Sequence, residues 1–247
     1  YQFRQNDLNH GGEGAPLTPI FHFLISGILK TKFNLDFPMK IINIGGITNV
    51  SQIKINNSEN ENLFAYDIAP GNCLIDEWIR KKSNKKFDFN GDIASRGEVN
   101  NLILNQTIDN FNIKDFKNSL DVKNFDISFT RGLNLEDGCA TITKYTAYLI
   151  SEGLKKIDEI NKLNTVNLYL CGGGRKNNTL IENINEYLNN KKINLKNIDE
   201  YEFDGDFIES QAFAYLAIRS YLGLPISYPN TTRTLKPISG GIIEKNY

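Results

Sequence analysis

One aspartate stands where a carboxylate could act as a general base. Asp67 ends the run Leu63-Phe-Ala-Tyr-Asp67, which we predict to be a β-strand, and the turn Ala69-Pro-Gly-Asn72 follows it. A carboxylate at a strand end can project into a cleft and accept a proton from a reacting group. The local pattern alone slightly favours another role, in which Asp67 is an Asx-turn residue that caps the chain reversal.

Glycine-rich turns are the second feature that could do chemistry. Four of them adjoin predicted elements: Gly11-Gly-Glu-Gly14, Gly45-Gly46, Pro70-Gly71 and Gly172-Gly-Gly174. Glycine lets a backbone approach a ligand closely, and a turn between a strand and a helix aims several N–H groups at one point, which suits phosphate. An ordinary hairpin or αβ turn explains any one of them alone. The segment at 171–174 is the most suggestive, although it matches neither the dinucleotide-binding nor the Walker pattern.

The remaining polar candidates have plainer explanations. Asp76 and Glu77 fit the solvated face of a helix, and Glu209 in the first turn of the last predicted helix complements the helix dipole. His22 lies in an apolar helix and is expected to be a hydrogen-bonded core histidine, whereas His10 is uninformative. With only these two histidines, and no C-x-x-C motif among three cysteines, the sequence predicts neither a multi-histidine metal site nor a zinc ribbon.

Composition narrows the partners and the compartment. The 247 residues carry 28 Lys and Arg against 29 Asp and Glu, so no net basic field attracts nucleic acid or an anionic membrane. Apolar stretches stay short of the roughly 20 residues of a membrane span, and three widely spaced cysteines fit a reducing cytoplasm. The chain starts at Tyr1 in a polar segment with no visible signal peptide. We therefore expect a cytoplasmic protein and a chain that lacks an N-terminal part.

Periodicity predicts an α/β protein of one large or two small domains. Short β-branched or alternating runs predict strands at 40–44, 47–55, 63–67 and 166–171, the first two joined by Gly45-Gly46 as a hairpin. Helical patterns cover 20–29, 73–81, 97–108, 178–188 and 207–222, with another that starts at 135. Thr18 and Pro19 give the first helix its start signal. The alternation of strands and helices after residue 135 favours layered α/β architecture.

Several motifs occur in order along essentially the whole chain. They are Asp7-x-x-x-Gly11-Gly-Glu-Gly-Ala-Pro-Leu17 with Phe21-His22, Asn43-Ile-Gly-Gly-Ile-Thr-Asn49, Tyr66-Asp67-x-x-Pro70-Gly-Asn72 with Asp76-x-Trp78, Lys117-Asn-Ser-Leu-Asp121 with Phe125, Ala140-Thr-Ile-Thr143, Cys171-Gly-Gly-Gly174 with Asn177, and Glu209-x-x-Ala212-Phe-Ala-x-Leu216. In this order and wording they resemble the anhydro-N-acetylmuramic acid kinase family. No single motif is specific, but six or more in register are.

The resemblance implies a ribonuclease-H-like lobe of the sugar kinase/Hsp70/actin architecture, with a mixed sheet flanked by helices. It implies an enzyme that uses ATP and water to open the 1,6-anhydro bridge of anhydro-N-acetylmuramic acid, giving N-acetylmuramate 6-phosphate and ADP in peptidoglycan recycling. Mg²⁺ would bridge the phosphates. Residues 1–36 would be a lobe-crossing segment with the sugar-site loop and a helix, and residues 37–247 the C-terminal nucleotide-binding lobe, the N-terminal lobe being absent.

The resemblance also assigns roles to residues. Asp67 matches the aspartate that activates water for attack at the anomeric carbon, so that the bridge oxygen leaves as O6 and takes the γ-phosphoryl group. The nucleotide-binding positions by this match are Gly45, Gly46 and Asn49 in a phosphate hairpin, and Gly172, Gly173 and Gly174 in the turn on the adenosine side. The substrate-binding loop by this match comprises Gly11, Gly12, Gly14, Ala15 and Pro16.

Three residues depart from the family pattern. Gln2 stands where Asp is common, Glu13 where Gln is frequent, and Arg233 where Gly usually follows Thr-Thr. The first weakens the match at the sugar-side loop, and the last could alter the nucleotide end of the cleft. The family's first phosphate loop, Gly-Thr-Ser-x-Asp-Gly, and its His-Gly-Gln-Thr segment have no counterpart here, so we expect this chain alone to be inactive.

Two alternatives stay open at this point. The chain could be a non-catalytic nucleotide- or sugar-binding module, because half a cleft can bind a ligand but cannot assemble a transition state. It could also be another sugar kinase of the same superfamily that acts on an ordinary hydroxyl. The expected partner is a small-molecule anhydro amino sugar, with no nucleic acid and no membrane, and a homodimer is left open.

Overall fold

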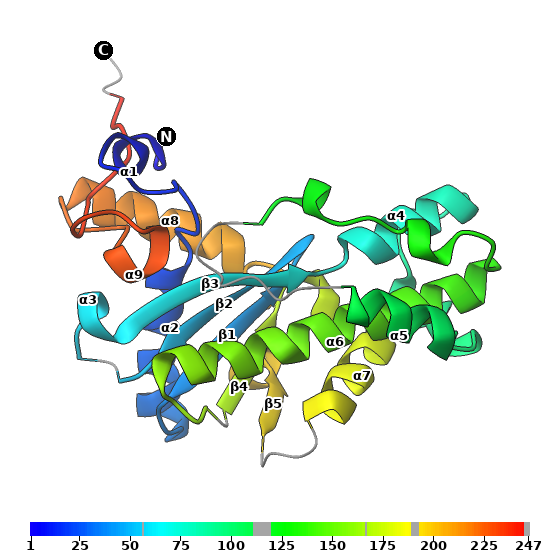
Figure 1. The fold of residues 1–247 in the computed structure, drawn as a ribbon. Coiled ribbons are helices and arrows are strands. Elements are labelled where there is room, and N and C mark those ends of the chain that lie inside the picture. The colour runs from blue at the N-terminus through cyan, green and yellow to red at the C-terminus, as the bar shows by residue number, and fades with distance from the viewer. Residues whose placement is uncertain (56, 111–119, 166, 189–192, 245–247) are drawn as a thin grey trace.

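The computed structural model describes the chain except for residues 56, 111–119, 166, 189–192 and 245–247. A mixed sheet of five strands in the order β3-β2-β1-β4-β5 forms the centre of the described part (Figure 1). The strands are β1 (Met39–Ile44), β2 (Ile47–Ile53), β3 (Leu63–Pro70), β4 (Asn167–Cys171) and β5 (Asn194–Asn197). β1, β2 and β3 form an antiparallel meander, and β4 and β5 run parallel to β1. The predicted α/β class with a mixed sheet flanked by helices is confirmed.

Helices flank this sheet on both faces. They are α1 (Gln5–Asn9), α2 (Pro19–Phe33), α3 (Glu59–Asn62), α4 (Cys73–Lys82), α5 (Asn101–Asp109), α6 (Leu135–Asn161), α7 (Asn178–Leu188), α8 (Ile208–Tyr221) and α9 (Pro229–Thr232). Short 3₁₀ turns lie at Phe89–Gly91, Ala94–Arg96, Val122–Asn124, Ser128–Thr130, Gly173–Lys176 and Ile198–Tyr201. No helix in the described part of the chain combines the length and the apolar character that a membrane crossing requires.

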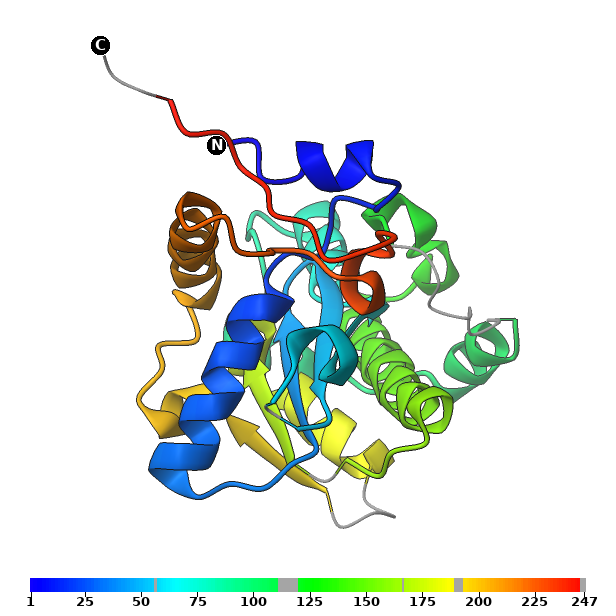
Figure 2. The same ribbon diagram turned by 90° about the vertical axis from the view of Figure 1, so that its left-hand side faces the viewer.

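Side-chain alternation along β1 explains why both faces of the sheet are covered. Ile42 and Ile44 are fully buried in a core shared with α4, α6 and α7, whereas Met39 and Ile41 are fully buried in a second core with α2 and α8. Figure 2 shows α2 and α8 next to each other on one side of the sheet and α6 on the other. Asn43 has the parity of Ile41 and therefore belongs to the face that α2 and α8 cover.

The predicted strands and most predicted helices are confirmed, with shifted ends. The strand predicted at 166–171 pairs with β1 in the sheet that holds the other three, although residue 166 itself, like residues 117–119 of one motif, lies outside the described residues. The helix predicted at 97–108 begins only at Asn101, because Asn100 is its N-cap and accepts a hydrogen bond from Ile103 N at 3.1 Å. A Cβ at Gly97 would overlap the backbone of Glu136, so this glycine lets the chain approach α6 closely.

A buried ion pair joins the start of β1 to α6. Lys40 Nζ lies 2.8 Å from Asp158 Oδ2, and the two side chains are only 1% and 10% exposed. Asp158 Oδ1 also accepts hydrogen bonds from Gln52 Nε2 and Thr165 Oγ1, both at 2.9 Å. The carboxylate thus accepts hydrogen bonds from three segments of the chain, including the backbone N–H of Thr165 at 3.4 Å.

Asp158→Ala is expected to destabilise the chain by about 3–5 kcal/mol, because it leaves the Lys40 ammonium buried without its counter-charge. Urea unfolding measures the change in the free energy of unfolding. The double variant Lys40→Met/Asp158→Leu removes both charges and should recover most of the loss. A loss below about 1 kcal/mol for Asp158→Ala, the range of an exposed pair, would contradict this account.

Candidate functional site

A row of polar residues crosses the sheet on the face that α2 and α8 cover. Strand register aligns Asp67 with Asn49, Asn49 with Asn43, and Asn43 with Cys171, which directly precedes Gly172. Residues paired across neighbouring strands point to the same face and lie one strand spacing apart. Two spacings of about 4.8 Å place Asp67 on the order of 10 Å from Asn43. The sheet thus connects the predicted base to the predicted nucleotide turn.

The turn after β3 holds the Gly45-Gly46 hairpin in place. Gly71 N donates to Gly46 O at 2.8 Å, and Asn72 N donates to Gly45 O at 2.7 Å. A Cβ on Gly71 would overlap Gly45 O, so only glycine allows the two turns to pack this closely. The two glycine turns that follow β1 and β3 therefore form one backbone cluster at this end of the sheet.

The turn after β4 joins that cluster. Gly172 adopts φ +77°, and a Cβ there would overlap Asn43 Oδ1. A Cβ on Gly174 would overlap the Ile44 side chain. Gly173 differs from both, because the nearest atom to its Cβ position is Asn72 Nδ2 at 3.8 Å. Two glycines of this turn are thus required by packing, while the third has open space.

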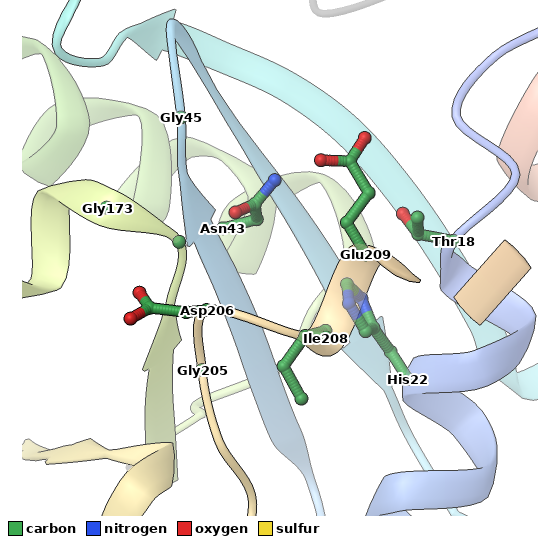
Figure 3. A pocket seen from close by; sticks show the side chains of 10 residues that line it. Thr18, His22, Asn43, Gly45, Gly173, Gly205, Asp206, Ile208 and Glu209 are labelled. Carbon is green, nitrogen blue, oxygen red and sulfur yellow. The ribbon is translucent and has the colours of Figure 1, made fainter. Parts of the chain in front are cut away.

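A pocket of about 170 Å³ lies between these turns and the N-terminal ends of two helices. It is lined by Thr18, His22, Asn43, Gly45, Gly172, Gly173, Gly205, Asp206, Ile208 and Glu209. Figure 3 shows the Asn43, His22 and Glu209 side chains gathered between α2, β1 and the start of α8. The glycine turns after β1 and β4 thus lie on the same side of the sheet and meet at one pocket. Three of the predicted nucleotide-binding residues do not line the pocket. Gly46 belongs to the hairpin beside it, Asn49 pairs with the pocket-lining Asn43, and Gly174 packs against Ile44 in the core.

A second pocket of about 350 Å³ adjoins the first and shares Gly173 and Asp206 with it. Its other lining residues are Asn72, Ile75, Asp76, Phe87, Asp88, Phe89, Asn90, Lys176 and Asn177. Phe87 and Phe89 are 52% and 64% exposed, and the centroids of their rings lie 6.4 Å apart. The sequence does not predict this pocket, because residues 85–125 are polar and show no clear periodicity. Phe87 and Phe89 fit neither a strand nor a helix pattern.

The sequence suggested that Asp76 lies on a solvated helix face, and the structure shows that it does not. It is half-buried at the wall of the larger pocket. Burial raises the pKa of Asp76 to about 6, and the nearby Asp88 carboxylate acts in the same direction against Arg80. Asp76 is half-buried because the segment after Phe87 folds back over the first turn of α4. The local sequence pattern of α4 cannot reveal this contact.

Arg175 holds the turn after β4 through a hydrogen bond and two ion pairs. Its buried guanidinium donates to Gly172 O at 3.0 Å and forms ion pairs with Asp199 at 3.0 Å and Asp206 at 2.7 Å. Asp206, which lines both pockets, also pairs with Lys176. Hydrogen bonds from Arg175 lower the pKa of Asp206, so this carboxylate is ionised at neutral pH. Sequence reasoning missed Arg175, since its partners lie 24 and 31 residues away.

The loop at 11–16 lies beside the strand that carries Asp67. Asp7, fully buried in α1, accepts hydrogen bonds from Gly14 N at 2.7 Å and from Thr232 Oγ1 at 2.6 Å. Glu13 N donates to Thr232 O at 2.8 Å. These bonds hold the loop against the end of α9, which itself packs on β3. Segments from the two ends of the chain thus meet over β3, as Figure 2 shows.

Asp67 is half-buried on β3. Its Oδ2 accepts a hydrogen bond from Leu120 N at 3.0 Å, not from the turn that follows it, so the Asx-turn role is not what the structure shows. Burial raises the pKa of Asp67, and the Glu13 carboxylate acts in the same direction. The Leu120 N–H and the Arg233 guanidinium oppose that rise.

Arg233 lies at the Asp67 end of the polar row, not at the nucleotide end where the sequence placed its effect. Its Nη2 donates to Ala65 O at 3.0 Å, and its guanidinium carbon lies 5.3 Å from the centre of the Tyr66 ring. Its backbone has φ +67°, a conformation that glycine adopts more easily. Ala65 and Tyr66 directly precede Asp67 on β3. These contacts place the charge of Arg233 near the Asp67 carboxylate, although the two residues are 166 positions apart in the sequence.

Arg233→Gly is expected to raise the pKa of Asp67, because it removes a positive charge that favours the ionised carboxylate. Asp67 would then lose its charge at a higher pH as the solution is acidified. Glu13→Gln should move the pKa the other way. A ¹³C NMR titration of the aspartate carboxyls measures this, with Asp67→Asn to assign the signal and Arg131→Gly as a remote charge control. An unchanged or lowered pKa in Arg233→Gly would refute the assignment.

Together, a mixed α/β sheet, glycine turns at its strand ends and a carboxylate in register with them define an α/β protein with a candidate ligand site where these strands end. The family model for anhydro-N-acetylmuramic acid kinase matches residues 1–246, and the chain belongs to this family.

Known relatives agree with that assignment. The anhydro-N-acetylmuramic acid kinase of Pelagibacter ubique is 48% identical over all of this chain and 64% of its own length. That of Agrobacterium fabrum is 36% identical over 98% of this chain and 63% of its own length. The chain therefore spans just under two thirds of these relatives. Among solved structures, the activator of 2-hydroxyisocaproyl-CoA dehydratase from Clostridium difficile with bound ADPNP matches 76% of this chain and 63% of its own, with TM-score 0.46 and 14% identity.

Proposed function

We propose that this chain supplies the nucleotide pocket and the general base of a kinase that uses ATP and water to open 1,6-anhydro-N-acetylmuramic acid. The products are N-acetylmuramate 6-phosphate and ADP, and the process is peptidoglycan recycling. The observation that carries the proposal is the row from Asp67 through Asn49 to Asn43, which puts the base and the glycine pocket on one face of the sheet.

The reaction needs two centres at a fixed separation. Water must attack the anomeric carbon while the bridge oxygen, leaving as O6, takes the γ-phosphoryl group. Asp67 stands on the order of 10 Å from Asn43 across two strand spacings, which leaves room for one sugar ring between base and phosphate. The loop at 11–16, held beside β3 by Asp7, would contact that ring. Asp67 accepts the proton of the attacking water.

Nucleotide binding would use both pockets. The smaller pocket offers the backbone of Gly45, Gly172 and Gly173, together with the first residues of α8, to phosphate oxygens. The larger pocket offers Phe87 and Phe89, whose half-exposed rings suit a flat base. Gly173 lies in the wall common to the two pockets. This order puts the adenosine on the Gly172–Gly174 side, as the resemblance implies.

The carboxylates at the pocket suit Mg²⁺ held largely through water. The described residues contain no group of three or more metal-ligating side chains, but Mg²⁺ on a nucleotide commonly keeps several waters and uses one or two carboxylates. Asp206 and Glu209 are the carboxylates that line the smaller pocket, so they would hold the ion. Bound there, Mg²⁺ would supply positive charge that neutralises the phosphates. We also propose that residues 1–36 are the lobe-crossing segment and that 37–247 form the nucleotide-binding lobe.

A chimera tests the proposal on a complete enzyme. In it, this chain replaces the matching 64% of the Pelagibacter ubique relative. With ATP and Mg²⁺, the chimera should phosphorylate anhydro-N-acetylmuramic acid and leave N-acetylmuramic acid and N-acetylglucosamine essentially unchanged. Equal turnover of the reducing sugars would instead favour a kinase for an ordinary hydroxyl. ATP binding without turnover of any sugar would favour a non-catalytic binding module.

A further inference from the structure

His22 is buried, yet one of its ring nitrogens faces the smaller pocket. The side chain is 1% exposed and its Nδ1 lies 2.7 Å from Ser51 Oγ on β2. No described residue hydrogen-bonds its Nε2, and His22 is one of the pocket-lining residues (Figure 3). Most buried polar side-chain atoms have a hydrogen-bond partner within the protein or with water. The unpartnered nitrogen therefore points to a ligand.

The charge state of the ring follows from its surroundings. Burial lowers the pKa of His22 to about 4, so the imidazole is neutral at pH 7 and carries a single N–H. The Ser51 hydroxyl can then donate to Nδ1, which fixes the tautomer with the hydrogen on Nε2.

The pocket around this nitrogen contains several hydrogen-bond donors that suit a phosphate oxygen, beside the carboxylates of Asp206 and Glu209. Thr18 at the start of α2, and Ile208 and Glu209 at the start of α8, line it, and both helices exceed three turns. Helix N-termini carry partial positive charge and free N–H groups. Thr18 makes no side-chain cap bond in α2, so its hydroxyl is not committed to the helix. His22, Thr18 and the glycine backbone thus surround one small volume.

We propose that His22 is a ligand-contacting residue whose Nε2–H donates to an oxygen of the terminal phosphoryl group of the bound nucleotide, with Ser51 as its positioning residue. This inference rests on the proposed function, since it takes ATP as the ligand. A neutral donor stabilises the phosphoryl oxygens and adds no ion pair with Glu209 that would compete with the ligand.

Nitrogen NMR of the ¹⁵N-histidine-labelled chain tests the geometry without any need for turnover. The chain has two histidines, and exposed His10, which directly follows α1, serves as the internal reference. We expect His22 to show the Nε2–H tautomer in the free chain. Its Nε2 signal should shift on addition of a non-hydrolysable ATP analogue with Mg²⁺, and much less with ADP or AMP. The Nδ1–H tautomer, or an equal response to AMP, would overturn the inference.

Binding measurements separate a ligand contact from a structural role. His22→Phe should weaken binding of the ATP analogue roughly tenfold or more, the range for a lost hydrogen bond to a charged group, and leave AMP binding unchanged. His22→Gln, which keeps an N–H near the Nε2 position, should recover part of the loss, and His10→Gln should change nothing. Equal loss for AMP and the ATP analogue would show a structural role only. Tight ATP binding with no His22 effect refutes this inference alone, whereas absence of all nucleotide binding refutes the proposed function as well.

Discussion

Asp67→Asn should lower kcat of the chimera by about 10²–10⁴-fold, the usual contribution of general-base assistance. Water is a weak nucleophile at neutral pH, and the anomeric carbon lacks a good leaving group until its bridge oxygen is phosphorylated. The asparagine keeps the shape of Asp67 and can still accept the hydrogen bond from Leu120 N, which the structure places at 3.0 Å. What it loses is the capacity to take a proton.

ATP binding should survive this change, because Asp67 stands two strand spacings from the pocket-lining Asn43. The dissociation constant for ATP is therefore measured alongside kcat. Asp109→Asn, an exposed aspartate at the end of α5, is the matched control and should leave both unchanged. Near-normal turnover of Asp67→Asn would show that Asp67 is not the base.

Gly173→Val is expected to weaken ATP binding about tenfold or more, which corresponds to about 1.4 kcal/mol. The position has room within the protein, as the nearest atom to a Cβ is Asn72 Nδ2 at 3.8 Å. A valine there would project into the wall shared by the two pockets and block the approach of a phosphate to the backbone. Isothermal calorimetry with ATP and Mg²⁺ measures the loss.

Gly174→Val provides the contrast. A Cβ at Gly174 would overlap Ile44 in the core, so this variant should lose folding stability before any question of binding arises. The two neighbouring glycines thus separate a binding effect from a folding effect. An unchanged ATP affinity in Gly173→Val, with its thermal stability intact, would exclude the turn from the nucleotide site.

Local signals in the sequence were enough to predict the central strands and the glycine turns. The hairpin at Gly45-Gly46 has alternating runs on both sides, and α2 has Pro19 at its first position, so each is specified within about ten residues. β5 was missed because Asn194-Leu-Lys-Asn197 has no β-branched residue, and its parallel pairing with β4 creates the strand. The residues of a segment alone cannot predict a strand that exists because it pairs with a neighbouring strand.

The candidate site could be predicted in its backbone but not in its side chains. Asp67 and the glycines lie at strand ends, where a sequence pattern can place them. The contact of Arg233 with Ala65 O, and of His22 with Ser51, joins residues 168 and 29 positions apart. Only strand register and helix packing bring such pairs together. For the same reason His22 could be placed in the core from its apolar neighbours, but the nitrogen that faces the pocket could not.

Oxygen labelling of the substrate tests the central claim most directly, namely that phosphoryl transfer to O6 and opening of the anhydro bridge occur at one site. Anhydro-N-acetylmuramic acid is prepared with ¹⁸O in the 1,6-bridge and incubated with the chimera, ATP and Mg²⁺. We expect ³¹P NMR to find the ¹⁸O bonded to phosphorus in N-acetylmuramate 6-phosphate, and Asp67→Asn to slow its formation by the same factor as kcat. A phosphorylated product with the bridge intact, or ¹⁸O retained at the anomeric carbon, would contradict it.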